Sequence, residues 1–236
     1  MNLFPSPGQL WSGFLQLIYP ELCVACGSDL PYATTCFCLK CKSRLSVSDM
    51  HRCRENEFVQ RLWGRLPLEG GAAAYYFTRQ SPIRHAIHHL KYRNKPEIGL
   101  ILGREFGRAL RTAEGFQTID AIIPVPLHPR KERLRGYNQS TMFAQGLAEA
   151  MDRPLWNGIL VRNTNTETQT HKKRMERFQN VDAMFGLRKP QMLEGKHLLL
   201  ADDVLTTGAT LEICGQTLLQ AKDARLSCAT IAIAAR

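Results

Sequence analysis

The sequence predicts an α/β domain with a mainly parallel sheet, preceded by a small cysteine-rich module. From about residue 70 onward, short apolar runs alternate with segments of helical periodicity, which is the pattern of a sheet whose strands are joined by helices. Six of the eight cysteines fall between Cys23 and Cys53, so this stretch differs from the rest of the chain. With 236 residues, 44% of them hydrophobic, the chain is long enough for one medium domain and such a module.

The same pattern places the individual elements. Buried strands are expected over residues 72–78, 119–126, 196–203 and 226–234. The last of these is apolar on both faces, which suits a parallel sheet covered by helices. Helices are expected from Pro82, from Pro96, over residues 140–151 and after Gly208. Residues 43–57 are polar and weakly patterned, so they are interpreted as a connector. The expected domains are therefore residues 1–57, with the cysteine module, and residues 58–236.

Charge and the N-terminal stretch narrow the class of protein. The chain has 31 Lys and Arg against 21 Asp and Glu, a net charge of +10. This excess favours an anionic partner, either a phosphorylated small molecule or nucleic acid, although a basic but inert surface would give the same count. The N-terminal stretch lacks both the basic lead and the long apolar run of a signal peptide or membrane span. We expect a cytoplasmic protein with no membrane span.

Two Cys-x-x-Cys pairs predict a structural zinc site. A gap of two residues lets both thiolates of a tight turn reach one tetrahedral Zn²⁺, and cysteines crowded together in a reducing compartment favour metal over disulfides. A site with four cysteine ligands leaves no open position for catalysis. Cys36 precedes the second pair, so a shifted pairing is possible, and a further partial site at His51 and Cys53 stays open. The predicted ligands are Cys23, Cys26, Cys38 and Cys41.

The stretch "LLLADDVLTTGAT", residues 198–210, predicts a ligand site at the edge of the sheet. Asp202 and Asp203 come at the end of an expected strand, where open α/β sheets bind their ligands. The turn that follows leads into a helix, so its N–H groups and the helix dipole suit a phosphate, while the carboxylates can accept hydrogen bonds from sugar hydroxyls. A ribose 5-phosphate would satisfy both halves. The alternative is a strand-to-helix turn with capping residues. The expected phosphate contacts are Thr206, Thr207, Gly208, Ala209 and Thr210.

This stretch resembles the phosphoribosyl-pyrophosphate (PRPP) motif of the type I phosphoribosyltransferases, except that Ala201 replaces a larger aliphatic residue. "PVPLHPRKERLRGYNQS" resembles the signature of the ComF family, also called ComFC-like or GntX-like, in which a zinc ribbon precedes a phosphoribosyltransferase domain. "LKYRNKPE" and "TQTHKKRMERFQNV" match the same family in order and spacing. The resemblance implies the type I phosphoribosyltransferase fold, and it covers the chain from Cys23 to the last strand. One complete cysteine set makes a second zinc unexpected.

The resemblance also implies functions for the basic motifs. PRPP needs cations for its pyrophosphate, and "LKYRNK" would supply them through Lys91 and Arg93, with Tyr92 between them as a further expected contact. A mobile loop closes over PRPP in the type I enzymes, and the cation-rich stretch of residues 170–178 is the candidate, with Arg174 grouped with Asp202 and Asp203 as catalytic. A solvated charge run that contacts nucleic acid is an equal alternative. The cations assigned to either pyrophosphate or nucleic acid are Arg130, Lys131, Arg133, Arg135, Lys172, Lys173 and Arg177.

Two functions follow. In the first, Mg²⁺ bound with PRPP neutralises the leaving pyrophosphate, Asp202 and Asp203 stabilise an oxocarbenium-like ribose, and a nitrogenous acceptor attacks. In the second, the protein is a non-catalytic, PRPP- or nucleotide-responsive adaptor of DNA uptake. The ComF resemblance implies natural competence, with single-stranded DNA and a competence helicase as partners. The sequence identifies no acceptor.

Overall fold

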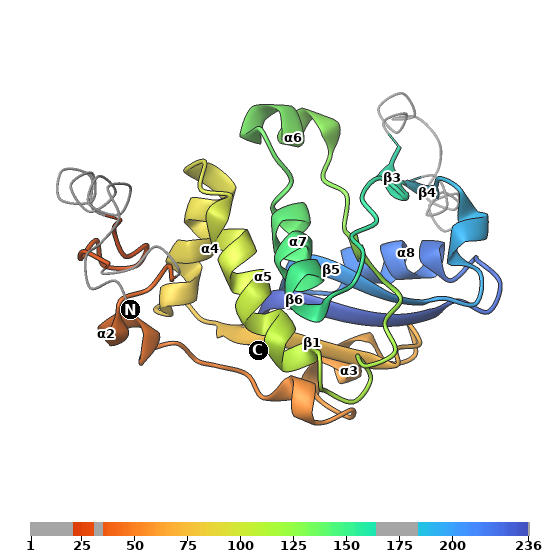
Figure 1. The fold of residues 1–236 in the computed structure, drawn as a ribbon, viewed down its shortest axis with the longest axis horizontal. Coiled ribbons are helices and arrows are strands. Elements are labelled where there is room, and N and C mark those ends of the chain that lie inside the picture. The colour runs from red at the N-terminus through yellow and green to blue at the C-terminus, as the bar shows by residue number, and fades with distance from the viewer. Residues whose placement is uncertain (1–20, 31–34, 164–183, 236) are drawn as a thin grey trace, which may run out of the picture.

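The computed structural model describes residues 21–30, 35–163 and 184–235 (Figure 1). Its main sheet has four strands, all parallel, in the order β1-β6-β5-β2. These are β1 (Gly70–Phe77), β2 (Ala121–Pro124), β5 (His197–Leu205) and β6 (Arg225–Ala234). The final strand, β6, lies between β1 and β5 and is buried along nearly all of its length. Its apolar residues on both faces therefore match a central position, as the sequence predicted.

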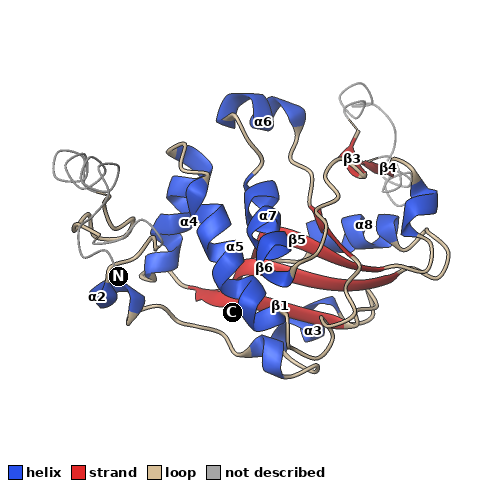
Figure 2. Ribbon diagram, viewed as in Figure 1, coloured by secondary structure: helices blue, strands red, loops and turns tan. Residues whose placement is uncertain are grey.

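Helices cover both faces of this sheet (Figure 2). On one side α4 (Pro82–Tyr92), α5 (Glu97–Leu110) and α7 (Gln139–Met151) lie together, and α7 packs on β2 and β5. The other side carries α3 (Glu57–Leu62) and α8 (Ala209–Leu218). Phe58 of α3 packs against Gly71 of β1, while Leu66 and Leu226 close on Gly215 of α8. The α/β class predicted from the sequence is confirmed.

The remaining elements lie at the ends of the molecule. The cysteine module, which contains the short helix α2 (Leu39–Lys42), packs beside α4, and η1 (Met50–Arg52) follows it. At the opposite end an antiparallel pair, β3 (Leu160–Arg162) and β4 (Phe185–Leu187), lies next to α8 and is followed by η5 (Pro190–Leu193). Between β2 and α7, helix α6 (Pro129–Arg135) projects away from the sheet and buries none of its residues.

Three details differ from the sequence prediction. The expected connector, residues 43–57, is ordered: the Ser48 N–H donates to the Ala74 carbonyl and the Tyr76 N–H to the Ser46 carbonyl, so this segment pairs with the outer edge of β1. Strand β5 does not end at the acid pair but continues to Leu205, because its ladder with β6 persists past Asp202. The sequence predicts a loop at "LKYRNK", after the helix that begins at Pro82, whereas Lys91 and Tyr92 are the last residues of α4.

None of the helices among the described residues is long and apolar enough to cross a membrane.

Candidate functional site

The acid pair lies at the carboxyl end of β5, where three elements meet. Asp202 Oδ1 accepts hydrogen bonds from the Ser140 hydroxyl and from the Asp203 N–H, both at 2.8 Å. Asp203 Oδ2 lies 2.8 Å from Lys91 Nζ at the end of α4. Ser140 is buried in the first turn of α7, whose N-cap Asn138 also donates to the Val125 carbonyl beyond β2. The fold thus brings α4 and α7 to the same two carboxylates.

The two carboxyl groups have different electrostatic environments. Burial, together with the charge of the neighbouring Asp203, raises the pKa of Asp202 to about 7. Asp203 is only 6% exposed, and the charge of Lys91 compensates its own. The contact with Lys91 is a charge pair, because no hydrogen bond of regular geometry from a described residue reaches Asp203 Oδ2. A ligand hydroxyl therefore still has acceptor oxygens available at this position.

The loop after β5 has the geometry of an anion site. Gly208 adopts φ +84° and is the N-cap residue of α8, so the chain turns sharply from strand to helix. A Cβ at Gly208 would lie 2.7 Å from a side-chain carbon of Leu62, which adds a steric reason for glycine. The Ala209 N–H donates to Thr207 Oγ1 at 3.4 Å, and no side chain caps the helix at Gly208. The loop of residues 206–210 thus presents the N-terminus of α8 beside the acid pair, as the sequence predicted.

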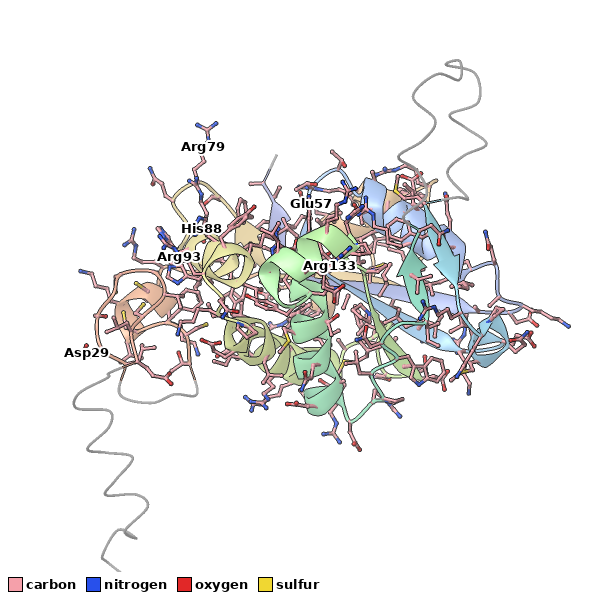
Figure 3. The ribbon with its side chains drawn as sticks, turned by 90° about the horizontal axis from the view of Figure 1, so that it is seen from above. Asp29, Glu57, Arg79, His88, Arg93 and Arg133 are labelled. Atoms are coloured by element: carbon pink, nitrogen blue, oxygen red, sulfur yellow. The ribbon has the colours of Figure 1, made fainter. Side chains whose placement is uncertain are left out.

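The basic motifs border this site to different degrees. The guanidinium of Arg135 lies 5.4 Å from the centre of the Tyr92 ring, and the Tyr137 hydroxyl donates to the Leu90 carbonyl, so the end of α6 and the end of α4 are joined. Figure 3 shows Arg133 on α6 and Arg93 at the end of α4, both on the surface. Lys131 is also exposed on α6, and Arg130 is the second residue of the same helix. Lys172, Lys173, Arg174 and Arg177 lie outside the described residues.

Residues that were not predicted from the sequence also contribute to this region. Ser140 is 62 positions from Asp202 along the chain, and only the polar start of α7 marks it in the sequence. Arg61 and Arg65, in and just after α3, donate to the carbonyl groups of Thr206 and Thr207 in the loop of residues 206–210. With the end of β6 they enclose a cavity of about 300 Å³. No sequence pattern pointed to these arginines, because α3 begins at the end of a segment interpreted as a connector.

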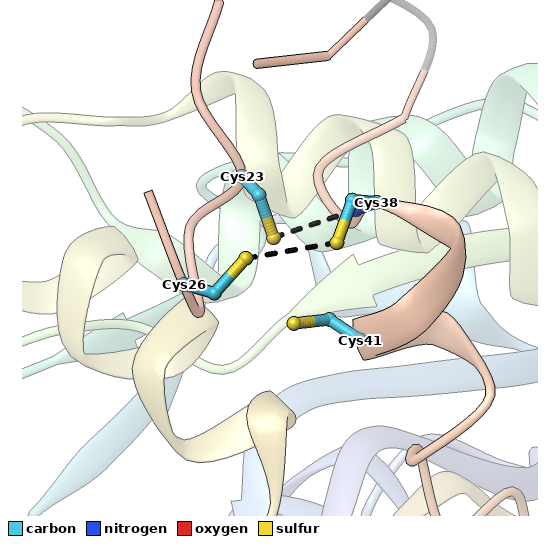
Figure 4. Close-up of side chains that lie close together, drawn as sticks. All are labelled: Cys23, Cys26, Cys38 and Cys41. Carbon is cyan, nitrogen blue, oxygen red and sulfur yellow. Dashed lines mark hydrogen bonds between the residues drawn. The ribbon is translucent and has the colours of Figure 1, made fainter. Parts of the chain in front are cut away.

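The four predicted zinc ligands come together (Figure 4). The sulfur atoms of Cys23, Cys26, Cys38 and Cys41 all lie within 4.8 Å of one another, and the Cys26 and Cys38 sulfurs are 3.6 Å apart. Tetrahedral Zn–S bonds of about 2.3 Å require sulfur separations near 3.8 Å, so the set fits Zn²⁺. A hydrogen bond with Ser28 is the main cause that lowers the pKa of Cys26 to about 6, which favours the thiolate that a metal needs.

The other candidate ligands do not join this set. Within the described part of the chain, it is the one group of three or more potential metal ligands that converges. Cys36 is buried elsewhere, and burial raises the pKa of its thiol to about 12. Cys53 donates to the Glu55 carbonyl, and the His51 ring packs edge-on against Phe106. The structure therefore selects the unshifted pairing of the two Cys-x-x-Cys units.

Comparisons with known proteins agree with this geometry. Residues 138–236 match the model of the phosphoribosyl transferase domain family. The chain is 30% identical over 206 residues to Competence protein F of Haemophilus influenzae, covering 84% of each chain. It is 29% identical to Competence protein ComFC of Bacillus subtilis, covering 87% of this chain and 82% of that protein.

A third relative matches over a shorter stretch. DNA utilization protein YhgH of Salmonella typhimurium is 33% identical over 142 residues, which is 59% of this chain and 62% of that protein's length. The phosphoribosyltransferase domain includes the acid pair and the loop of residues 206–210, and the four-cysteine module precedes it. With Competence protein F matched along most of both chains, this protein belongs to the ComF family of competence proteins.

Proposed function

We propose that the protein binds PRPP and transfers its phosphoribosyl group to a nitrogenous acceptor in a Mg²⁺-dependent reaction. The observation that supports this proposal is the convergence of three features at one end of β5: the Asp202–Asp203 pair, the loop of residues 206–210 and Lys91. We call this loop the phosphate loop. Carboxylates, an amide-rich turn and a cation are the three kinds of group that a ribose carrying a phosphate and a pyrophosphate requires.

Each part of the site has a chemical role in this proposal. The N-terminus of α8 binds the 5-phosphate through the loop of residues 206–210. Asp202 and Asp203 accept hydrogen bonds from the ribose hydroxyls, and their negative charge stabilises the positive charge that develops on the ribose as its bond to pyrophosphate breaks. Lys91 and Arg93 contact the pyrophosphate, with Tyr92 beside them. When bound with the substrate, Mg²⁺ supplies charge neutralisation for the departing pyrophosphate.

In this proposal Lys91 changes its partner when PRPP binds. Its ammonium group compensates the Asp203 carboxylate in the free protein, and its side chain is 24% exposed. When ribose hydroxyls donate hydrogen bonds to the carboxylate, the ammonium group can turn to the pyrophosphate, so the carboxylate stays hydrogen-bonded and the ammonium group stays paired with a negative charge. The eight cysteines all lie in the described part of the chain and none of them forms a disulfide, which fits a reducing compartment such as the cytoplasm.

Calorimetric titration of PRPP, with and without Mg²⁺, tests the proposal. The wild-type protein should bind PRPP, and the Asp202→Asn/Asp203→Asn double variant should lose this binding while it keeps its fold. Asp152→Asn is a matched control, because Asp152 is exposed at the C-terminal end of α7. A screen of nitrogenous acceptors for pyrophosphate release then tests catalysis. Undiminished affinity in the double variant would contradict the assignment of the acid pair.

A second candidate function is a DNA-binding adaptor that responds to PRPP. The projecting helix α6 carries exposed Lys131 and Arg133 and buries no residue, so these two side chains can reach a phosphate backbone. Two of the relatives are named for competence and a third for DNA utilization. Binding through these cations should be independent of base sequence and should weaken steeply with salt. Tyr92, 66% exposed beside Arg135, could stack on an unpaired base.

Fluorescence anisotropy of a labelled single strand across a salt series separates the two functions. The adaptor predicts binding at low salt that Lys131→Gln/Arg133→Gln weakens, and that PRPP with Mg²⁺ lowers through competition for shared cations. If the protein does not bind the single strand at low salt, the adaptor function is excluded and the phosphoribosyltransferase is the one remaining candidate function.

A further inference from the structure

Helix α3 packs against the back of the phosphate loop. Its Phe58 and Leu62 are completely buried, and Leu62 fills the space where a Cβ of Gly208 would lie. Gln216 of α8 donates to the carbonyl of Arg65, three residues beyond the end of α3. Residues 57–65 are therefore fixed to the sheet and to α8, on either side of the loop.

Two arginines from this segment bind the loop through its carbonyl groups. Arg61 Nη1 donates to the Thr206 carbonyl at 3.3 Å, and its Nη2 donates to the Ala234 carbonyl and to Glu57. Arg65 Nη2 donates to the Thr207 carbonyl at 3.1 Å, and its Nη1 forms an ion pair with Glu212, in the first turn of α8, at 2.8 Å. Two successive peptide groups of the loop are therefore held from the same side.

The geometry of the peptide group gives these contacts a consequence on the other side of the loop. In a planar trans peptide the C=O and N–H bonds point in opposite directions. A Thr206 carbonyl directed at Arg61 therefore turns the Thr207 N–H away from α3, and the Thr207 carbonyl directed at Arg65 does the same for the Gly208 N–H. Successive N–H groups that point the same way at a helix N-terminus form an anion-binding nest.

We propose that Arg61 and Arg65 are positioning residues that hold the phosphate loop in its phosphate-binding conformation before the ligand arrives. This inference rests on the proposed function, because it assigns the 5-phosphate to the loop. Neither arginine contacts the phosphate. They act by excluding conformations of the free loop in which the two peptide groups are rotated. Ligand binding therefore loses less conformational entropy.

Charge alone does not account for the arrangement. Arg61 is paired with Glu57 and Arg65 with Glu212, so each guanidinium is compensated locally. What a guanidinium adds is a planar fork that reaches several acceptors at once, which an ammonium group cannot reproduce in the same geometry. Arg65 uses this fork to join the loop to α8, and Arg61 uses it to join the loop to the end of β6.

Variants of Arg65 test the proposal, because its side chain is 38% exposed whereas that of Arg61 is 6% exposed and needed for packing. Arg65→Gln removes the fork and Arg65→Lys keeps the charge. Arg54→Gln is the matched control, since Arg54 is an exposed arginine that pairs with Glu69 and does not contact the loop. We expect both Arg65 variants to bind ribose 5-phosphate about 10- to 100-fold more weakly by calorimetry, as for loss of hydrogen bonds to a charged group.

Amide NMR relaxation in the free protein provides a readout that does not depend on the ligand. The order parameters of the Thr207 and Gly208 amides should fall from about 0.85 toward 0.6 in Arg65→Gln and stay high in Arg54→Gln. If wild-type protein binds neither PRPP nor ribose 5-phosphate, the proposed function fails, whereas relaxation still reports on the loop. Unchanged order parameters in Arg65→Gln would overturn the inference. Wild-type phosphate affinity in Arg65→Lys would also overturn it, because charge would then suffice.

Discussion

Asp202 and Asp203 are adjacent in sequence but do not serve the same purpose in the free protein. Asp203 forms an ion pair with Lys91, whereas Asp202 accepts hydrogen bonds from a hydroxyl and a backbone N–H and forms no ion pair with any residue that the structure describes. Burial and the charge of Asp203 therefore favour the protonated form of Asp202. A carboxylate kept at a cost in stability is common where the negative charge is needed for a ligand.

This difference predicts a stabilising substitution. The pKa of Asp202 is raised from 3.8 to about 7, so its contribution to stability is fully present below about pH 4 and is lost as the pH rises through 7. Asp202→Asn resembles the protonated acid and can still accept from Ser140. At about pH 8 we expect its thermal midpoint to exceed the wild-type value by about 3 °C or more, with the difference vanishing near pH 4.

Scanning calorimetry at both pH values measures this effect. Asp203→Asn is the comparison, because it removes the partner of Lys91 and should lower the midpoint at the higher pH. A midpoint of Asp202→Asn below that of the wild type at about pH 8 would show that the carboxylate is stabilised in the fold.

At the scale of elements, the sheet was predictable and the smaller elements were not. Strand β5 contains the continuous apolar run of residues 198–201, and β6 is apolar on both faces over most of its length, as in strands of a parallel sheet that is covered on both sides. Helix α6 buries nothing, so it has no apolar periodicity to detect, and β3 and β4 have three residues each. The acid pair and the loop were predicted because they are contiguous. Arg65 was missed because it meets Thr207 across 142 positions of sequence.

The packing of α5 against α7 fixes the position of Ser140 and yields a prediction at this scale. The two helices cross at Gly103 and Gly146, where a Cβ on Gly103 would lie 2.3 Å from the Phe143 carbonyl oxygen. Gly103→Ala therefore forces the helix backbones apart. We expect a net loss of about 1–3 kcal/mol in the free energy of unfolding, despite the better helix propensity of alanine.

Urea unfolding followed by circular dichroism measures this loss. Arg108→Ala is the control on the same helix, because Arg108 is exposed and its replacement should change stability by less than about 0.5 kcal/mol. Equal stability of Gly103→Ala and the wild type would mean that the helices separate freely, and the placement of Ser140 by this contact would then be wrong.

At the scale of the whole molecule, the cysteine module and the sheet form one structure. Cys36, Phe37, Leu45 and Met50 belong to the same buried cluster as the strands. Lys42 of α2 pairs with Glu105 of α5, which also accepts from the Tyr75 hydroxyl of β1. The segment after α2 pairs with the outer edge of β1, where an uncovered strand would offer free backbone groups to other chains. The cysteine module therefore helps to complete the sheet.

Metal removal should for this reason destabilise the whole protein and not the module alone. We expect the purified protein to hold about one zinc, and Cys38→Ser to lose it, because four thiolates are needed to close the site. Without the metal, α2 and the segment that covers β1 lose their anchor, so the thermal midpoint of the main transition should fall and aggregation should increase. Cys53→Ser is the matched control, since Cys53 lies outside the four-cysteine set. Elemental analysis measures the zinc content of both variants, and calorimetry measures their thermal midpoints. A zinc-free Cys38→Ser protein with the thermal midpoint of the wild type would show that the sheet is stable without the module.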